Sequence, residues 1–249
     1  MNILIIGYGV VGHNLSKELS KLNPDIYDKY KTDHNTKRNI KYDITFVCVD
    51  TPLLSDYSLD ITEVKNAIND NDSEIYVIKS TCPLGTVEKL KEGANKRIIF
   101  SPEYYGGTQH CNNFEFNFTI LGGDKEDCVE VIQELQHCYD GRHTFRITDS
   151  RTAELVKFME NSFLATKVSF CNQFYNICQE NNISYEELRE LFVLDPRVNS
   201  SHTFVYKDKP FWDSHCLNKD VPYIAYSGDN KLLKAVCEFN KEQKDSVGD

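Results

Sequence analysis

The chain opens with a short apolar run, residues 2–6, that leads directly into Gly7-Tyr8-Gly9-Val10-Val11-Gly12. The run suits a strand buried on both faces of a parallel sheet, and apolar residues then recur at helical spacing. A G-x-G-x-x-G between a strand and a helix lets backbone amides approach a pyrophosphate at a positive helix end. We therefore expect a dinucleotide-binding fold whose cofactor contacts include Gly7, Gly9, Val10, Val11 and Gly12.

An acidic residue follows at the end of the second expected strand. Asp28 closes the run Ile26-Tyr27-Asp28, where a carboxylate binds the adenosine ribose hydroxyls of NAD. The same charge would repel the additional phosphate of NADP. The alternative is a glycine turn accompanied by a solvated Asp. We predict NAD as the cofactor.

Strand-like and helix-like segments alternate over the first 150 residues. This alternation favours a doubly wound parallel Rossmann-type α/β sheet, and we assign residues 1–149 to it. Residues 29–41 are expected to be loop. Strands are expected at 2–6, 26–28, 44–49, 75–79, 97–100, 118–121 and 144–147, and helices at 11–22, 63–68, 86–92 and 127–138.

The pattern changes near Asp149. From Thr152 to about Asn181 apolar residues recur at threes, fours and fives without Pro or Gly, which predicts one long helix buried against something large. A further helix is expected at 186–192, loop at 195–220 and a frayed tail at 243–249. Residues 150–249 are thus predicted to form a smaller, all-helical domain.

Two polar residues interrupt the apolar stripe of the long helix. Lys157 and Asn161 are four residues apart and share one face. Burying them is costly unless they contact a ligand or each other, and a desolvated Lys could act as an acid/base or an oxyanion donor. The alternative is a Lys that faces solvent.

Three further residues could take part in chemistry. Thr81 and Glu103 follow expected strands, and open α/β sheets bind ligands at the carboxyl ends of their strands. Either could instead be an ordinary loop residue. Cys216 lies beside His215 and near Lys219, which could activate a thiol, although it is one of nine cysteines.

The composition limits the partners of the chain. A formal charge of −10 argues against nucleic acid or an anionic membrane as the main partner. No segment approaches the length that spans a bilayer, and the N-terminal apolar run is too short for a signal peptide. The odd cysteine count without a C-x-x-C pair indicates reduced thiols and a cytoplasmic location. No metal site is expected.

Taken together, seven motifs in this order resemble the UDP-glucose/GDP-mannose dehydrogenase family of NAD-dependent nucleotide-sugar dehydrogenases. The resemblance covers residues 1 to about 225. The motifs are residues 7–12, 47–52, 79–86, 101–104, 153–165, 195–198 and 216–220.

The resemblance implies a role for each candidate residue. Cys216 would add to the C6 aldehyde formed by the first hydride transfer, and the thiohemiacetal would lose a second hydride before the thioester is hydrolysed. Lys157 would help to deprotonate the alcohol or stabilise the oxyanion, with Asn161 as its hydrogen-bonding companion. The other implied catalytic residues are Asp220 and Thr81, which share a water, and Glu103, which takes part in hydrolysis.

The same resemblance implies the binding residues and the assembly. Lys29, Thr51 and Thr81 would complete the NAD site, and Glu103, Tyr104, Lys157 and Asn161 would contact the sugar nucleotide. Arg197 would reach the substrate of a neighbouring subunit in a homodimer formed through the long helix. The implied setting is nucleotide-sugar metabolism for polysaccharide biosynthesis, with UDP-glucose or a related sugar nucleotide as the substrate.

The chain departs from the family pattern in four respects. The glycine-rich segment before the Cys is replaced by Phe211-Trp212-Asp213-Ser214-His215, and Gly106 and Gly107 stand where a second acid is usual. The loop at 29–41 is short. The chain stops at Asp249, where family members continue into a second nucleotide-binding domain, so we expect that domain to be lacking.

Two other functions are compatible with these residues. A one-step dehydrogenase of the β-hydroxyacid type also combines a glycine-rich nucleotide domain with a Lys-x-x-x-Asn helix, and would yield one NADH per turnover. A non-catalytic NAD-binding homologue would bind the cofactor and no sugar nucleotide. The joint presence of Lys157, Asn161, Cys216 and Asp220 argues against the second.

Overall fold

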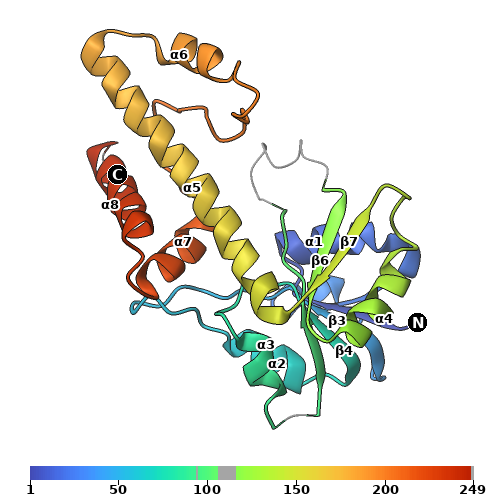
Figure 1. Cartoon of the computed structure of the whole chain (residues 1–249). Coiled ribbons are helices and arrows are strands. Elements are labelled where there is room, and N and C mark those ends of the chain that lie inside the picture. Colours follow the sequence, from blue (N-terminus) through green and yellow to red (C-terminus); the bar gives the residue numbers. More distant parts are fainter. Residues whose placement is uncertain (94, 106–115, 248–249) are drawn as a thin grey trace. The chain divides into compact units, whose positions relative to one another are not determined.

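The computed structural model describes residues 1–93, 95–105 and 116–247. They form two compact units, Met1–Lys157 and Phe158–Asp249, and helix α5, Ser150–Asn181, runs from the first into the second (Figure 1). The strands of the first unit are β1 Ile3–Ile6, β2 Asp25–Tyr27, β3 Tyr42–Val47, β4 Ser73–Ile78, β5 Arg97–Phe100, β6 Phe118–Gly122 and β7 Thr144–Thr148. Its helices are α1 Val10–Glu18, α2 Thr62–Asn69, α3 Thr86–Lys91 and α4 Lys125–Leu135, with short 3₁₀ helices at Ser20–Leu22 and Thr32–His34; the second unit adds α6 Tyr185–Phe192, α7 Leu217–Tyr226 and α8 Lys231–Val247.

The strands form one Rossmann-type sheet, as predicted, in the order β2-β1-β3-β4-β5-β6-β7. Neighbouring strands are parallel except for β5 and β6, which pair antiparallel at Phe100 and Gly122. A parallel pair needs a long crossover, usually through a helix, and the described residues between β5 and β6 contain none. After β1 the chain forms β2 on one side of β1, and it then crosses over to form β3 on the other side of β1. This reversal creates the switch point at which such sheets bind ligands.

Alternate residues of the inner strands β1, β3, β4 and β5 enter opposite hydrophobic cores. Ile3 and Ile5 of β1 belong to the core that α1 and α4 cover, whereas Leu4 and Ile6 belong to the core under α2 and α3. Because both faces of these strands are buried, their sequences are mainly apolar. That property makes them recognisable in the sequence.

The start of α5 is joined to the first unit by a buried carboxylate. Glu154 accepts hydrogen bonds from the backbone amides of Gly85 (2.5 Å) and Val87 (3.0 Å) at the N-terminus of α3. Burial raises the pKa of Glu154, although these two bonds oppose the shift. Gly122 allows β6 to approach the start of α5 closely, since a Cβ at position 122 would lie 2.3 Å from the Cβ of Ala153.

The second unit is helical and contains no strand among its described residues. Two expectations are wrong here. Residues 217–220 begin α7 although they were expected to be loop, and α8 continues to Val247 through most of the expected frayed tail. Pro222 lies inside α7 and looks like a helix breaker in sequence, and the polar end of α8 is held by a tertiary contact, since Asn176 donates to Gln243.

No helix in the described part of the chain is both long enough and apolar enough to cross a membrane.

Candidate functional site

The glycine turn lies between β1 and α1, at the switch point of the sheet. Gly7 has φ +90°, and a Cβ there would meet the carbonyl oxygen of Cys48 at 2.5 Å. A Cβ on Gly12 would lie only 1.9 Å from the carbonyl oxygen of Gly7. A Cβ on Gly9, the N-cap residue of α1, would meet nothing within 4 Å. Packing therefore requires glycine at positions 7 and 12. At Gly9 the absence of a side chain leaves space for a pyrophosphate to approach the backbone.

Asp28 follows β2 and braces this turn. Its Oδ2 accepts from the amide of Tyr8 (2.6 Å), and its Oδ1 accepts from the amides of Tyr30 (2.8 Å) and Lys31 (2.9 Å). Burial alone would raise the pKa of Asp28, but these three amides together lower it below its ordinary value. Lys31 completes the brace by donating to the carbonyl oxygen of Tyr8 at 2.7 Å. Sequence reasoning missed Tyr8 and Lys31, whose role arises only where β1 and β2 end side by side.

The remaining predicted cofactor residues lie around the same edge. Val10 begins α1 with an exposed side chain, and Val11 packs against the sheet. Lys29 forms an exposed ion pair with α2. Thr51 and Thr81 follow the neighbouring strands β3 and β4, and the buried Thr51 hydroxyl donates to the carbonyl oxygen of Thr81 at 2.7 Å. These features make a cradle that fits NAD.

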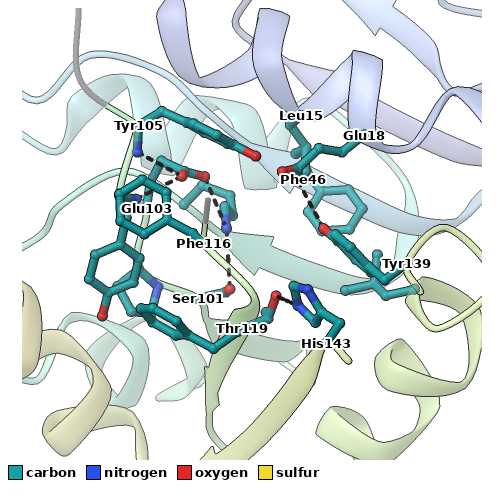
Figure 2. Close-up of a pocket in the computed structure, with 15 residues that line it drawn as sticks. Leu15, Glu18, Phe46, Ser101, Glu103, Tyr105, Phe116, Thr119, Tyr139 and His143 are labelled. Carbon is teal, nitrogen blue, oxygen red and sulfur yellow. Dashed lines mark hydrogen bonds and ion pairs between the residues drawn. The ribbon is translucent and has the colours of Figure 1, made fainter. Parts of the chain in front are cut away.

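Glu103 follows β5 and faces a small cavity of about 30 Å³ (Figure 2). Its Oε2 lies 3.2 Å from Nζ of Lys79, and its Oε1 accepts from the amides of Tyr104 (2.7 Å) and Tyr105 (3.1 Å). Lys79 also donates to the hydroxyl of Ser101 at 3.3 Å. The sequence identifies Lys79 only as the first residue of the motif at 79–86. A Lys directly after a buried strand nevertheless indicates a paired charge.

A second polar pair lines the same cavity. Tyr139 donates to Oε2 of Glu18 at 2.8 Å. Burial raises the pKa of both groups, most strongly that of Tyr139. Nε2 of His143 lies 2.8 Å from the hydroxyl of Thr119, and burial lowers the pKa of this imidazole. None of these residues was a candidate from the sequence, because they come from separate elements.

Lys157 is buried, and its ammonium lies 4.9 Å from the ring centroid of Tyr104. The structure thus brings together two predicted substrate residues from α5 and from the segment after β5. A cation over an aromatic face is attracted by the ring quadrupole. Tyr104 also connects Lys157 with Glu103, to which its own amide donates.

In the second unit, three buried polar residues join α5 to α7. Nδ2 of Asn161 donates to Oδ2 of Asp220 at 2.6 Å, and Nζ of Lys219 lies 2.8 Å from Oδ1 of the same carboxylate. Asp220 is 1% exposed. Cys216 is the N-cap residue of α7 and is partly exposed, and its carbonyl oxygen accepts from the amide of Asp220 at 2.9 Å.

Arg197 lies apart from this cluster, on the segment between α6 and α7. Its side chain is 88% exposed and pairs with Asp195 at 2.6 Å. Gly106 and Gly107 lie outside the described residues.

Two family models match the chain. The model described as "UDP-glucose/GDP-mannose dehydrogenase family, NAD binding domain" matches residues 26–140, and the model of the central domain of that family matches residues 151–242.

Curated relatives and a solved structure agree with these matches. The chain is 28% identical to a UDP-N-acetyl-D-mannosamine dehydrogenase of Methanococcus maripaludis, with 94% of the chain and 60% of the relative covered. It is 27% identical to a UDP-glucose 6-dehydrogenase of Rickettsia bellii, with 98% of the chain and 67% of the relative covered. The chain thus spans roughly three fifths to two thirds of these relatives. A UDP-glucose dehydrogenase structure from Pyrobaculum islandicum has the same fold, with a TM-score of 0.82 at 20% identity over 97% of this chain and 68% of that one.

Proposed function

Because the chain belongs to the UDP-glucose/GDP-mannose dehydrogenase family, we propose that it is an NAD-dependent nucleotide-sugar 6-dehydrogenase. In this proposal it oxidises the C6 alcohol of a sugar nucleotide to the acid in two hydride transfers. NAD, when bound in the cradle at Gly9, supplies the hydride acceptor. The single observation that carries the proposal is the buried Asn161–Asp220–Lys219 cluster one turn from Cys216.

Burying this cluster costs free energy, and a protein that only binds NAD would not need it. Ionised side chains are expensive to bury unless they are paired, and Asp220 and Lys219 are paired directly. Asn161 uses the second oxygen of the carboxylate. The arrangement holds an acid at a defined position on the helix whose N-cap is Cys216, which suits control of a water or a proton in covalent catalysis.

The proposed reaction proceeds through a thiohemiacetal and a thioester. Lys157 takes part in deprotonating the C6 alcohol, and the hydride leaves for NAD. The Cys216 thiol then adds to the aldehyde, so that its sulfur bonds to C6 and its proton passes to solvent or to a neighbouring base. Loss of a second hydride gives a thioester, and water cleaves its C–S bond to release the acid and regenerate the thiol. Glu103 and Asp220 are proposed for the water step, with Thr81.

UDP-glucose is the proposed substrate, and UDP-N-acetylmannosamine is the competing one. The relatives include enzymes named for each of these two substrates. Both carry the primary alcohol at C6 that this chemistry requires. We propose that Tyr104 and Arg197 contribute to substrate binding, the latter across a subunit boundary.

A homodimer through α5 is also proposed. Within the second unit, the helix exposes large apolar side chains at spacings of three, four and seven residues, which places them along one stripe. Such stripes mark interaction surfaces. The residues are Met159, Phe163, Phe170, Phe174 and Ile177.

The test is NADH release from purified protein supplied with NAD and a panel of UDP- and GDP-sugars. We expect two NADH per sugar and an acid product. Cys216→Ser should form no acid, whereas full acid output from this variant would refute the proposed role of the thiol. One NADH per sugar would favour the β-hydroxyacid-type alternative. NAD binding with no turnover of any sugar nucleotide would favour the non-catalytic one.

A further inference from the structure

The segment Phe211–Cys216, here called the Cys loop, contains no glycine. A loop that leads into a helix commonly uses glycine to adopt its turn. Here side chains from outside the loop and from within it hold the backbone. Three sets of contacts do so, all within the second unit.

The first is a bracket between the loop and α8. The amide of Trp212 donates to Oδ1 of Asn240 at 2.8 Å, and Nδ2 of Asn240 donates to the carbonyl oxygen of Trp212 at 3.0 Å. One side-chain amide thus satisfies both backbone groups of one residue. Both residues are buried, so neither hydrogen bond competes with water. Losing them would leave buried backbone groups unpaired, which is costly.

The second is the Trp212 ring. Its Nε1 donates to the hydroxyl of Ser169 on α5 at 3.1 Å. The ring belongs to a small core with Leu217 and Val221, which lie one turn apart on α7. The residue that α8 brackets therefore also packs beneath the first turns of the helix that Cys216 caps.

The third set connects the loop with the first turn of α7. The hydroxyl of Ser214 accepts from the amide of Leu217 at 3.2 Å, and Oδ1 of Asp213 accepts from Nδ2 of Asn218 at 2.7 Å. The hydrogen bond to Asn218 and that to Lys209 lower the pKa of Asp213. Ser214 thus satisfies one backbone amide at the N-terminus of α7, and Asp213 connects the Cys loop to the side chain of Asn218.

We propose that Asn240 and Trp212 are positioning residues that hold Cys216 at the N-terminus of α7. In this arrangement side chains of α8 and α5 hold the conformation of the Cys loop, which glycine residues would otherwise make possible. A thiol held at the N-terminus of a helix lies in the positive field of the helix end, which favours the thiolate. The inference rests on the proposed function for its catalytic meaning, but the positioning itself can be measured without any turnover.

Trp212 is the only tryptophan of the chain, so intrinsic fluorescence reports directly on the Cys loop. The test variants are Asn240→Ala, which removes the bracket, and Ser169→Ala, which removes only the acceptor of the indole N–H. The matched control is Gln243→Ala, because Gln243 also lies on α8 and accepts a tertiary hydrogen bond from Asn176 on α5, a residue outside the Cys loop. Circular dichroism checks that each variant is folded.

Three measurements are made on each full-length variant. They are the emission maximum, the pH profile of iodoacetamide alkylation at Cys216 followed by peptide mass spectrometry, and NADH release. We expect Asn240→Ala to shift emission to longer wavelength and the alkylation profile to higher pH by about half a unit. Turnover should fall by up to about 100-fold with little change in NAD affinity. Ser169→Ala should show smaller shifts in the same directions, and Gln243→Ala none.

The outcomes separate the two proposals. Wild-type emission and alkylation in a folded Ser169→Ala or Asn240→Ala variant would overturn the positioning role. The same holds if Gln243→Ala gives shifts as large as those of Asn240→Ala, since the effect would then be a general loosening of α8. If the wild-type protein turns over no sugar nucleotide but the emission and alkylation shifts occur, the positioning role stands and the proposed function fails. If Asn240→Ala does not fold, Ser169→Ala decides.

Discussion

Nζ of Lys79 lies 3.2 Å from Oε2 of Glu103, and the two side chains are only 8% and 12% exposed. The pair connects the ends of two neighbouring strands, β4 and β5, on which the ligand-binding edge of the sheet depends. Removing one member of a buried pair leaves an uncompensated charge, whereas exposed pairs contribute little. This contrast gives the first prediction.

Lys79→Met is expected to lower the free energy of unfolding by about 3–5 kcal/mol. The control is Lys41→Met, because Lys41 pairs with Glu74 at the surface, where the loss of an ion pair has little effect on stability. Urea denaturation followed by circular dichroism measures both. The double variant Lys79→Met/Glu103→Leu should recover much of the loss. Equal stability of the Lys79 and Lys41 variants would contradict the prediction.

Gly9→Ala and Gly12→Ala should fail in different ways. A Cβ at position 12 would lie 1.9 Å from a backbone oxygen, whereas one at position 9 would meet no atom of the protein. Gly12→Ala should therefore lower the melting temperature markedly, because the backbone itself must move. Gly9→Ala should melt like wild type but bind NAD at least about tenfold more weakly, since its methyl group occupies the approach of the pyrophosphate. Differential scanning fluorimetry and calorimetric titration with NAD distinguish the two. Normal NAD binding by Gly9→Ala would count against the assigned cradle.

Asp28→Asn should remove a pH-dependent contribution to stability. The folded state lowers the pKa of Asp28 below its ordinary value of 3.8, so the fold favours the ionised form. That contribution is present above about pH 4 and is lost as the pH falls through the lowered pKa. Wild type should thus be more stable than Asp28→Asn at pH 7, and the difference should shrink as the pH falls from about 5 through the lowered pKa.

The measurement is urea unfolding of both proteins across this range. Asp33→Asn, at an exposed position of the same loop, is the control and should show no comparable pH-dependent difference. A constant difference between wild type and Asp28→Asn at every pH would show that the ionised carboxylate is not what braces Tyr8.

Charge on the exposed stripe of α5 should disrupt the proposed dimer. Phe163→Glu and Phe170→Glu place carboxylates among large apolar side chains that are 62% and 49% exposed. If α5 forms the interface, each variant should become monomeric at micromolar concentration, because burying an unpaired charge there is costly. Sedimentation equilibrium measures the mass. Leu232→Glu on α8, also at an exposed apolar position, should leave it unchanged, and dimers that survive both α5 substitutions would exclude this interface.

Local patterns determined much of the first unit. The inner strands are mainly apolar, and the glycine turn is a short motif between a strand and a helix, so both are readable from the chain. The long helix was equally clear, because thirty residues without Pro or Gly leave few alternatives. The beginning of α7 cannot be predicted from the pattern, because Pro222 looks like a helix breaker. The end of α8 cannot be predicted either, because it depends on a contact with α5.

Periodicity, turn geometry and motif order are local properties of the chain, so they predict the nucleotide-binding fold, the long helix and the candidate residues. They do not predict which groups pair: Lys79 with Glu103, Asp28 with Tyr8, Lys157 with Tyr104, Asp220 with Asn161 and Asn240 with Trp212. All five pairs join residues that lie about 20 or more positions apart in the sequence. Their energies come from burial and from short hydrogen bonds, and neither exists until separate strands and helices have packed together.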